Sequence, residues 1–149
     1  MAANAKQLRL RIITPELTKV DEDVDMVIMR ATTGDMGILP GHEPRCAVLR
    51  YGIIRIFNGS QERRIAVFAG MASIERDVLT IITGGAEWPE DVDRARAQTD
   101  LEQAEMRLRE RTSDIELQHD QLLFRRALVR IEVSSYAFDD EENADEPRE

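Results

Sequence analysis

Few side chains in this sequence have the types and spacing that catalysis or metal binding requires. The histidines are His42 and His119, and the only cysteine is Cys46. His42 and Cys46 lie close enough for one metal site, but zinc takes about four ligands and two are not sufficient. Cys46 has no partner for a disulfide within the chain, and we expect it to be a small buried apolar residue. Chemistry carried by histidine or cysteine is therefore not the favoured interpretation.

Other reactive groups also lack the patterns that enzymes use. The sequence contains no Gly-x-Ser-x-Gly, no P-loop and no Gly-x-Gly-x-x-Gly after a strand. Most carboxylates lie among other charged residues, which favours a solvated surface. We expect His119, beside Asp120 in a predicted helix, to be a solvated residue, and His42 to have a structural or contact role. The sequence thus predicts no catalytic residues, no metal site and a protein that is not an enzyme.

The charge of the chain is concentrated at one end. The net charge is −9, and residues 139–149 contribute one base and seven acids, whereas residues 1–88 are balanced. A short acidic run repels itself and buries little apolar surface, so we expect 139–149 to be a disordered acidic tail. No clustered basic face favours nucleic acid. The sequence shows no secretion signal and no run of about 20 apolar residues, so we expect the chain to be soluble, although its partners could be bound to a membrane.

The first part of the chain, residues 1–87, has the pattern of a β-sandwich domain. Leu8, Leu10 and Ile12 alternate with arginines, as in a strand with one buried face. Asn58-Gly59 favours a tight hairpin turn, and Arg76-Asp77 lies between two further strand-like runs. Many short strands at this spacing predict an antiparallel sandwich or flattened barrel. A core of this size is expected to be stable by itself.

The second part, residues 88–138, has the pattern of a helical hairpin domain. Pro89 suits a first helical turn, and the acids after it suit the positive end of the helix dipole. Ser113 and Glu116 have the spacing of a capping box for the second helix. The predicted apolar stripes consist of Ala97, Leu101, Ala104 and Leu108 on the first helix and Leu117, Leu123, Phe124, Ala127, Leu128 and Ile131 on the second. Such narrow stripes predict a weakly docked antiparallel hairpin that could exchange one packing partner for another.

A turn-rich loop, residues 33–44, interrupts the strand pattern. Its glycines and prolines fix a specific backbone path. Met36, Ile38 and Leu39 are apolar residues among these turn formers. Two interpretations stay open: a strand with a turn at either end, and a protruding contact surface.

Five segments resemble the ε subunits of F-type ATP synthases. They are Thr14-Pro15, Gly34-Asp35-Met36-Gly37-Ile38-Leu39-Pro40-Gly41-His42-Glu43-Pro44, Leu49–Ile54, Ala69–Glu75 and Val92-Asp93-Arg94-Ala95-Arg96-Ala97. The second is close to the family's Gly-x-x-Gly-x-Leu-Pro-Gly-His-x-Pro, and Ala69 stands where the family has glycine. The resemblance covers roughly residues 8–133. It implies the same fold that the residue patterns predict: a β-sandwich followed by a two-helix hairpin.

The resemblance also implies partners and a place. The family lies at the foot of the central stalk, where it joins the γ subunit to the ring of c subunits and couples rotation to ATP synthesis. We therefore expect a non-catalytic, peripheral subunit on the cytoplasmic face of the bacterial cell membrane, with protons as the coupling ion and sodium as the alternative. In many members the hairpin extends and inhibits ATP hydrolysis by meeting an acidic loop of the catalytic β subunits.

Three groups of site residues follow from the resemblance. The rotor-ring contact is expected at Asp35, Met36 and His42, and the inhibitory contact at Arg125, Arg126 and Arg130. A weak nucleotide site is mapped onto Glu87, Val92, Asp93, Arg96 and Ala97. In ATP-binding members the position of Arg96 meets phosphate and that of Glu87 the base or sugar, but a further arginine of those members is Gln103 here. We therefore expect no cofactor and only weak ATP binding.

Two other functions remain open at this point. The hairpin of an ATP-level sensor would bind nucleotide, and an unrelated β-sandwich adaptor would share the fold without the partners.

The arginines of the second helix also have an alternative role. Arg126 and Arg130 lie four residues apart on one helix face, and instead of making the inhibitory contact they could pair with Glu105, Glu110 or Glu132 inside the hairpin.

Overall fold

A computed structural model describes residues 6–110 and 113–144, with side chains described to residue 137. The chain divides into two compact units, Met1–Ala86 and Glu87–Glu149. The elements in chain order are β1 (Leu8–Ile13), β2 (Thr18–Val24), β3 (Met26–Ala31), β4 (Gly34–Ile38), β5 (Arg45–Asn58), β6 (Gln61–Glu75), β7 (Val78–Ile82), β8 (Ala86–Glu87), the 3-10 turn η1 (Pro89–Asp91), α1 (Arg94–Glu110) and α2 (Asp114–Ala144). The predicted β-sandwich followed by two helices is confirmed.

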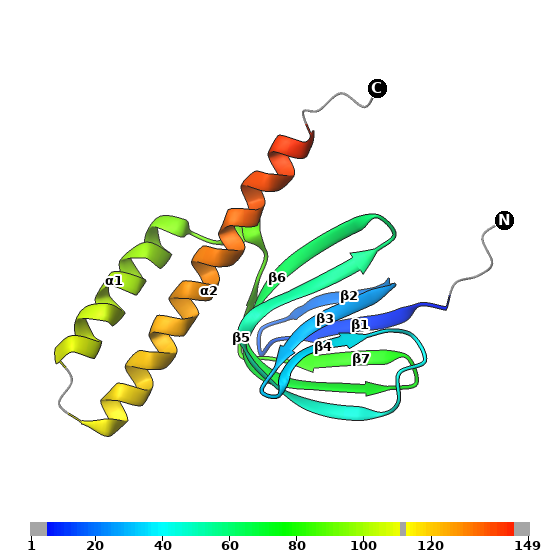
Figure 1. Ribbon diagram of the computed structural model, residues 1–149, viewed down its shortest axis with the longest axis horizontal. Coiled ribbons are helices and arrows are strands. Elements are labelled where there is room, and N and C mark those ends of the chain that lie inside the picture. The colour runs from blue at the N-terminus through cyan, green and yellow to red at the C-terminus, as the bar shows by residue number, and fades with distance from the viewer. Residues whose placement is uncertain (1–5, 111–112, 145–149) are drawn as a thin grey trace. The chain divides into compact units, whose positions relative to one another are not determined.

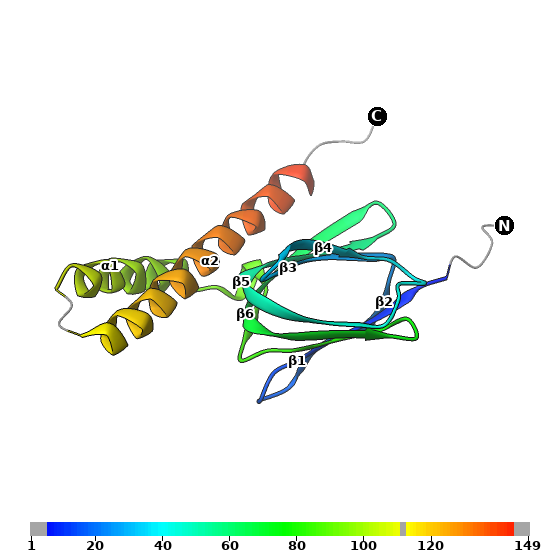
Figure 2. The same cartoon turned by 60° about the horizontal axis from the view of Figure 1, so that its bottom comes forward.

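The first unit is one sheet that folds back on itself. Its strand order is β2-β1-β7-β6-β5-β3-β4, with β8 paired to β6. The long strands β5 and β6 pair along most of their length (Figure 1). Seen from the second direction, β3 and β4 lie in one layer and β1 in the other (Figure 2). Neighbouring strands run antiparallel along this path except β1 and β7, which are parallel because no hairpin joins them.

The core of this unit follows the alternation that the sequence shows. Leu8, Leu10 and Ile12 are fully buried, whereas Arg11 between them is exposed. Both predicted hairpins are present. In the first, Asn58 already pairs with Gln61, so the turn is Gly59-Ser60 and Gly59 takes φ 61°. Glycine tolerates a positive φ at the first central position of a tight hairpin turn.

Cys46 is exposed, so the prediction that it is buried was wrong. In β5, Cys46 shares the outward face with the exposed Val48, whereas the buried Leu49 points to the opposite face, and the Cys46 thiol lies 3.8 Å from the hydroxyl of Ser73. The alternation of a strand, rather than the apolar character of the side chain, decides which way it points.

The helical unit begins differently from the expected helix at Pro89. Pro89–Asp91 form a 3-10 turn, Val92 is extended, and α1 begins only at Arg94. Asp93 caps α1 because its Oδ1 accepts the backbone N–H of Arg96 at 3.0 Å. A capping aspartate holds non-helical backbone, which separates the turn from the helix.

The two helices lie side by side (Figures 1 and 2). Ser113 Oγ accepts the N–H of Glu116 at 3.3 Å, which confirms one half of the predicted capping box. Ala97, Ala104 and Ala127 are buried, as the stripes predict. Leu128 was placed on the buried stripe of the second helix, but 42% of it is exposed. It follows Ala127 directly, and one residue turns the side chain by about 100° around the helix axis.

Helix α2 continues to Ala144, into the segment expected to be a disordered tail. That expectation was wrong for 139–144, and 145–149 lie outside the described residues. Extending an existing helix is much easier than starting one, and Glu and Ala are good helix formers. Among the described residues, neither helix is long and apolar enough to cross a membrane.

Candidate functional site

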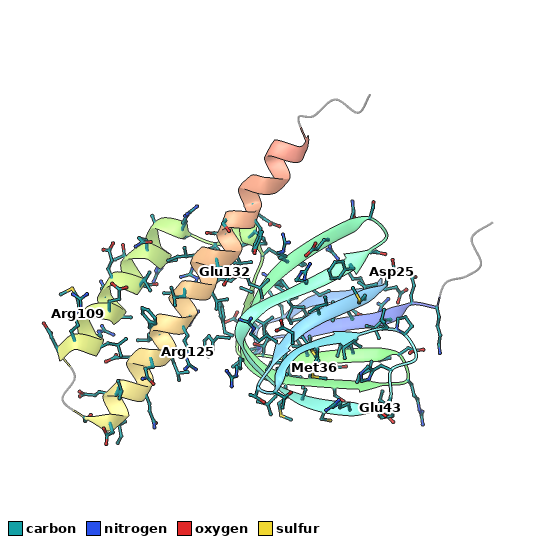
Figure 3. All side chains as sticks on the ribbon, viewed as in Figure 1. Asp25, Met36, Glu43, Arg109, Arg125 and Glu132 are labelled. Atoms are coloured by element: carbon teal, nitrogen blue, oxygen red, sulfur yellow. The ribbon has the colours of Figure 1, made fainter. Side chains whose placement is uncertain are left out.

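The residues expected at the rotor ring lie on and beside strand β4. Asp35 faces Arg30 across the β3–β4 ladder, and its Oδ1 lies 3.3 Å from the Arg30 Nε. Both side chains are more than half exposed, so this is a solvated ion pair. Met36 pairs with Met29 in the same ladder and is half-buried (Figure 3). The loop is thus a regular β-hairpin with a turn at either end.

His42 lies beyond the other end of β4. Its Nδ1 is 2.7 Å from the carbonyl oxygen of Glu43, and its backbone N–H donates to the carbonyl of Leu39 at 3.2 Å. The rest of β4, which ends at Ile38 and rises about 3.3 Å per residue, and the start of the following loop separate Asp35 from His42 along the chain. Asp35 and Met36 are thus neighbours on β4 whose side chains point to opposite faces of the strand, and His42 lies in the loop after the strand.

An ion-pair clamp holds the loop that carries His42. Asp77 accepts the backbone N–H of Gly41 at 2.7 Å and lies 2.9 Å from the Lys6 ammonium. These two contacts, the amide first, hold the pKa of Asp77 below its ordinary value. Asp77 and Arg76 form the β6–β7 turn with φ 59° and 51°, a conformation that aspartate tolerates better than most residues.

Sequence reasoning did not identify the exposed apolar row on one face of the sheet. Met71 pairs with Val48 on one side and with Ile82 on the other, and Ile82 pairs with Ile13. Val48, Met71 and Ile82 are 52%, 56% and 61% exposed. A contiguous row of exposed aliphatic side chains is the kind of surface that binds another protein. The signal was present, because these strands are apolar on both faces rather than alternating.

A separate hollow of about 490 Å³ lies between the two helices. Four arginines and three aspartates contribute to its wall, so it is polar and nearly balanced in charge. The lining residues are Asp91, Asp93, Arg96, Asp100, Gln103, Ala104, Arg107, Leu123, Arg126, Ala127 and Arg130. A mixed-charge hollow of this size can take an anionic ligand that displaces the internal acids.

Part of the predicted nucleotide site lies at this hollow. Asp93 and Arg96 line it, and so does Gln103. Ala97 is fully buried, and Val92 is half-buried beside the cap of α1. Asp100 and Arg107 also line the hollow and were not among the predicted residues. Arg96, Asp100, Gln103 and Arg107 are spaced 4-3-4 on α1, and this spacing was the available signal.

Arg130 pairs with different acids from the expected ones. Its Nε is 3.0 Å from Glu87 Oε2, and its Nη1 is 3.5 Å from Asp100 Oδ2. The alternative partners expected from the sequence were Glu105, Glu110 and Glu132, whereas the structure pairs Arg130 with Glu87 and Asp100. Only 13% of the Arg130 side chain is exposed.

The three arginines expected at the inhibitory contact do not share one surface. Arg126 and Arg130 line the hollow, as their spacing of four residues predicts. Arg125 is exposed and is not among the residues of the hollow (Figure 3). Arg125 and Arg126 are both exposed, whereas Arg130 is largely buried.

The chain matches two families in order along its length. Residues 7–89 match the ATP synthase, delta/epsilon chain, beta-sandwich domain. Residues 90–135 match the ATP synthase, delta/epsilon chain, long alpha-helix domain. The boundary between the matches falls close to the division between the two compact units.

Similar proteins span nearly the whole chain. The ATP synthase epsilon chain of Bacillus velezensis is 36% identical over 129 residues, which are 87% of this chain and 98% of that one. The epsilon chain of Alkaliphilus oremlandii is 42% identical over 104 residues, 70% of this chain and 78% of that one. A chain of the Euglena gracilis mitochondrial ATP synthase has the same fold, with a TM-score of 0.74 at 21% identity over 93% of this chain and 86% of its own length.

Proposed function

The chain belongs to the ATP synthase delta/epsilon family, as an epsilon chain, and we propose that it serves as a non-catalytic subunit of the central stalk. It would join γ to the c ring of a proton-translocating enzyme and couple rotation to ATP synthesis. The observation that carries this proposal is the pair of family matches, which follow one another over residues 7–135. A chain in the solved central stalk and c ring of the Tetrahymena thermophila mitochondrial ATP synthase has a TM-score of 0.53 at 11% identity, which supports the fold.

The apolar row is the surface that we assign to γ. Val48, Met71 and Ile82 are each more than half exposed and lie directly opposite one another on three neighbouring strands. Covering them would remove about 25 cal/mol of unfavourable hydration per Å² of apolar surface. The row lies on strands rather than loops, so the surface is rigid before binding, which lowers the entropic cost of association.

We assign the c-ring contact to the β3–β4 hairpin, through Asp35 and Met36. The Asp35 carboxylate is more than half exposed although it pairs with Arg30, so it can exchange this partner for a base on a c subunit. Exchanging one partner for another in a solvated ion pair changes the free energy little. Such a contact would orient the subunit on the c ring rather than supply most of the binding energy. His42 would reach the ring only through the separate loop that Asp77 holds.

The hairpin is the part that we propose restrains ATP hydrolysis. Its helices bury mainly alanines against each other, including Ala97, Ala104 and Ala127, and small side chains give a modest packing energy. A modest energy allows the helices to separate and α2 to reach the acidic loop of a catalytic β subunit. Arg125 is already exposed for that contact.

Nucleotide binding is a second proposal, and the hollow between the helices favours it. Arg96 and Arg126 supply positive charge there, but Asp93 and Asp100 oppose a phosphate, and Gln103 supplies no charge. We propose weak ATP binding, too weak to make the chain primarily an ATP sensor.

We propose that the assembled subunit lies at the cytoplasmic face of the bacterial membrane, to which its partner subunits attach it peripherally.

Purification of the tagged chain with its partners tests the central proposal. We expect γ and the c ring to co-purify with the parent chain and the variant Met71→Glu to lose γ. Gln61→Glu adds the same charge at an exposed position of the same strand and should retain it. Retention of γ by Met71→Glu would overturn the assignment of the apolar row, and absence of γ from the parent preparation would overturn the stalk proposal.

A further inference from the structure

One arginine ties three segments of the helical unit together. Glu87 precedes η1, Asp100 lies on α1 and Arg130 lies on α2. The Arg130 guanidinium meets Glu87 Oε2 at 3.0 Å through Nε and Asp100 Oδ2 at 3.5 Å through Nη1. The Arg130–Asp100 contact joins α2 to α1, and the Arg130–Glu87 contact joins α2 to the segment before η1.

Because both partners are largely buried, the Arg130–Glu87 pair is the part of this cluster on which the folded hairpin depends most. The Arg130 side chain is 13% exposed and that of Glu87 is 22% exposed, so water can solvate neither group fully. A guanidinium cannot lose its proton, so it cannot escape this cost by becoming neutral. When one partner of such a pair is removed, the remaining charge is left without compensation, and this costs more than the pair itself contributes.

The same guanidinium also lines the hollow between the helices. A phosphate entering the hollow would seek Arg130, which is already held from two sides. The Asp100 carboxylate is 47% exposed, lies in the wall of the hollow and carries the same sign of charge as a phosphate. A bound anion would therefore have to displace Asp100 from Arg130.

We propose that Glu87 and Asp100 are built-in ligands of Arg130, a latch that holds the hairpin folded without a bound nucleotide. The latch supplies from within the chain the negative charge that an anionic ligand would otherwise supply. Its physiological meaning rests on the proposed regulatory role of the hairpin, since opening the latch would release α2 toward a partner. The latch itself is a property of the isolated chain.

Amide hydrogen exchange of the full chain without nucleotide tests the latch. We expect protected amides in α1 and α2 of the parent, and exchange about tenfold faster or more in Arg130→Gln and Glu87→Gln. Asp100→Asn should have a smaller effect because Asp100 is more exposed. Arg125→Gln removes the same charge from an exposed position of α2 and should leave exchange unchanged.

The double variant Glu87→Gln with Arg130→Gln shows whether the two residues act through their mutual contact or independently. We expect its effect to be clearly less than the product of the two single effects, because each single change leaves the other charge buried. The amides of β5 and β6 serve as the internal reference for an intact sandwich.

Two results would overturn the latch: an unprotected hairpin in the parent, or exchange in Glu87→Gln and Arg130→Gln equal to that of Arg125→Gln. Neither depends on γ, the c ring or hydrolysis. Failure of the latch is thus distinguishable from failure of the stalk proposal, which the co-purification decides.

Discussion

The carboxylate of Asp77 accepts the backbone N–H of Gly41 at 2.7 Å, across 36 positions of sequence. This bond joins the β6–β7 turn to the loop after β4, and Lys6 adds a second contact to the same carboxylate at 2.9 Å. The loop that carries His42 is thus fixed by a residue outside its own motif. Its conformation should depend on Asp77 more than on any side chain within it.

Two substitutions at Asp77 separate the parts of this clamp. Asp77→Gly keeps the positive φ and removes the acceptor, so we expect faster hydrogen exchange at the Gly41 amide. Asp77→Asn keeps an acceptor oxygen and removes the charge, so the Gly41 amide should stay protected. Exchange measured by NMR on the two variants checks this, and equal exchange in both would contradict a side-chain clamp.

The charge of Asp77 also predicts a pH dependence. The Gly41 amide and Lys6 hold the pKa of Asp77 below its ordinary value of 3.8. The contribution to stability is therefore fully present above pH 3.8 and is lost as pH falls through the lower, folded pKa. The melting temperature of the parent should exceed that of Asp77→Asn by a constant amount at neutral pH, and the difference should shrink in acid. A difference that grows on acidification would contradict the lowered pKa.

Restoring a charge in the hollow should strengthen nucleotide binding. Gln103 lines the hollow on α1, and Gln103→Arg adds a charge-assisted hydrogen bond worth about 1.5–3 kcal/mol. We expect the affinity for ATP to rise about tenfold or more, measured by calorimetry on the isolated chain. Gln98→Arg places the same charge on the exposed part of α1, outside the hollow, and should have little effect. Equal gains in both variants would indicate general attraction to the helix rather than a site.

Local patterns predicted most of the sandwich but little of the site. The alternation of Leu8, Leu10 and Ile12 specifies one buried face, and the structure has that face. The Arg130 contacts join residues 43 and 30 positions apart, and no short-range periodicity reports which acid meets which base. The start of α1 was misplaced for a similar reason: Pro89 and Asp93 are both good starting residues, and the capping hydrogen bond decides between them.

Charge at Asp35 should affect coupling more than folding. Asp35→Asn removes a possible bond to the c ring without adding repulsion, whereas Asp35→Lys faces Arg30 across the ladder and adds a like-charge pair. We expect reduced proton pumping per ATP hydrolysed in the assembled enzyme, small for Asn and larger for Lys, since an exposed pair is worth about 0–1 kcal/mol. Arg30→Gln removes only the internal partner and should pump normally. Normal pumping by Asp35→Lys would argue against the contact.

The inhibitory arginines should behave differently from one another. Arg125 is exposed, so Arg125→Ala should weaken only the contact with the acidic loop and raise ATP hydrolysis by the whole enzyme about two- to fivefold. Arg130 is 13% exposed and holds the hairpin folded through Glu87, so Arg130→Ala has two opposed effects. It favours the open hairpin, which inhibits, and removes a base from it, which relieves inhibition. We therefore expect a smaller change in hydrolysis than with Arg125→Ala, together with loss of hairpin protection.

Salt and the acidic end of the chain complete this test. The attraction between exposed charges is screened over about 8 Å at physiological ionic strength and over about 3 Å at 1 M. High salt should therefore raise the rate of ATP hydrolysis in the parent and change the rate of Arg125→Ala less.

Residues 139–149 carry a net charge of −6, which opposes their approach to an acidic loop. Substituting Asn and Gln for these acids should therefore strengthen inhibition. Removal of residues 88–149 leaves β8 largely in place, because Gly85 and Ala86 remain with β6, and gives the uninhibited rate. If that removal raises hydrolysis while Arg125→Ala and Arg126→Ala leave it unchanged, the hairpin inhibits through a surface other than its arginines.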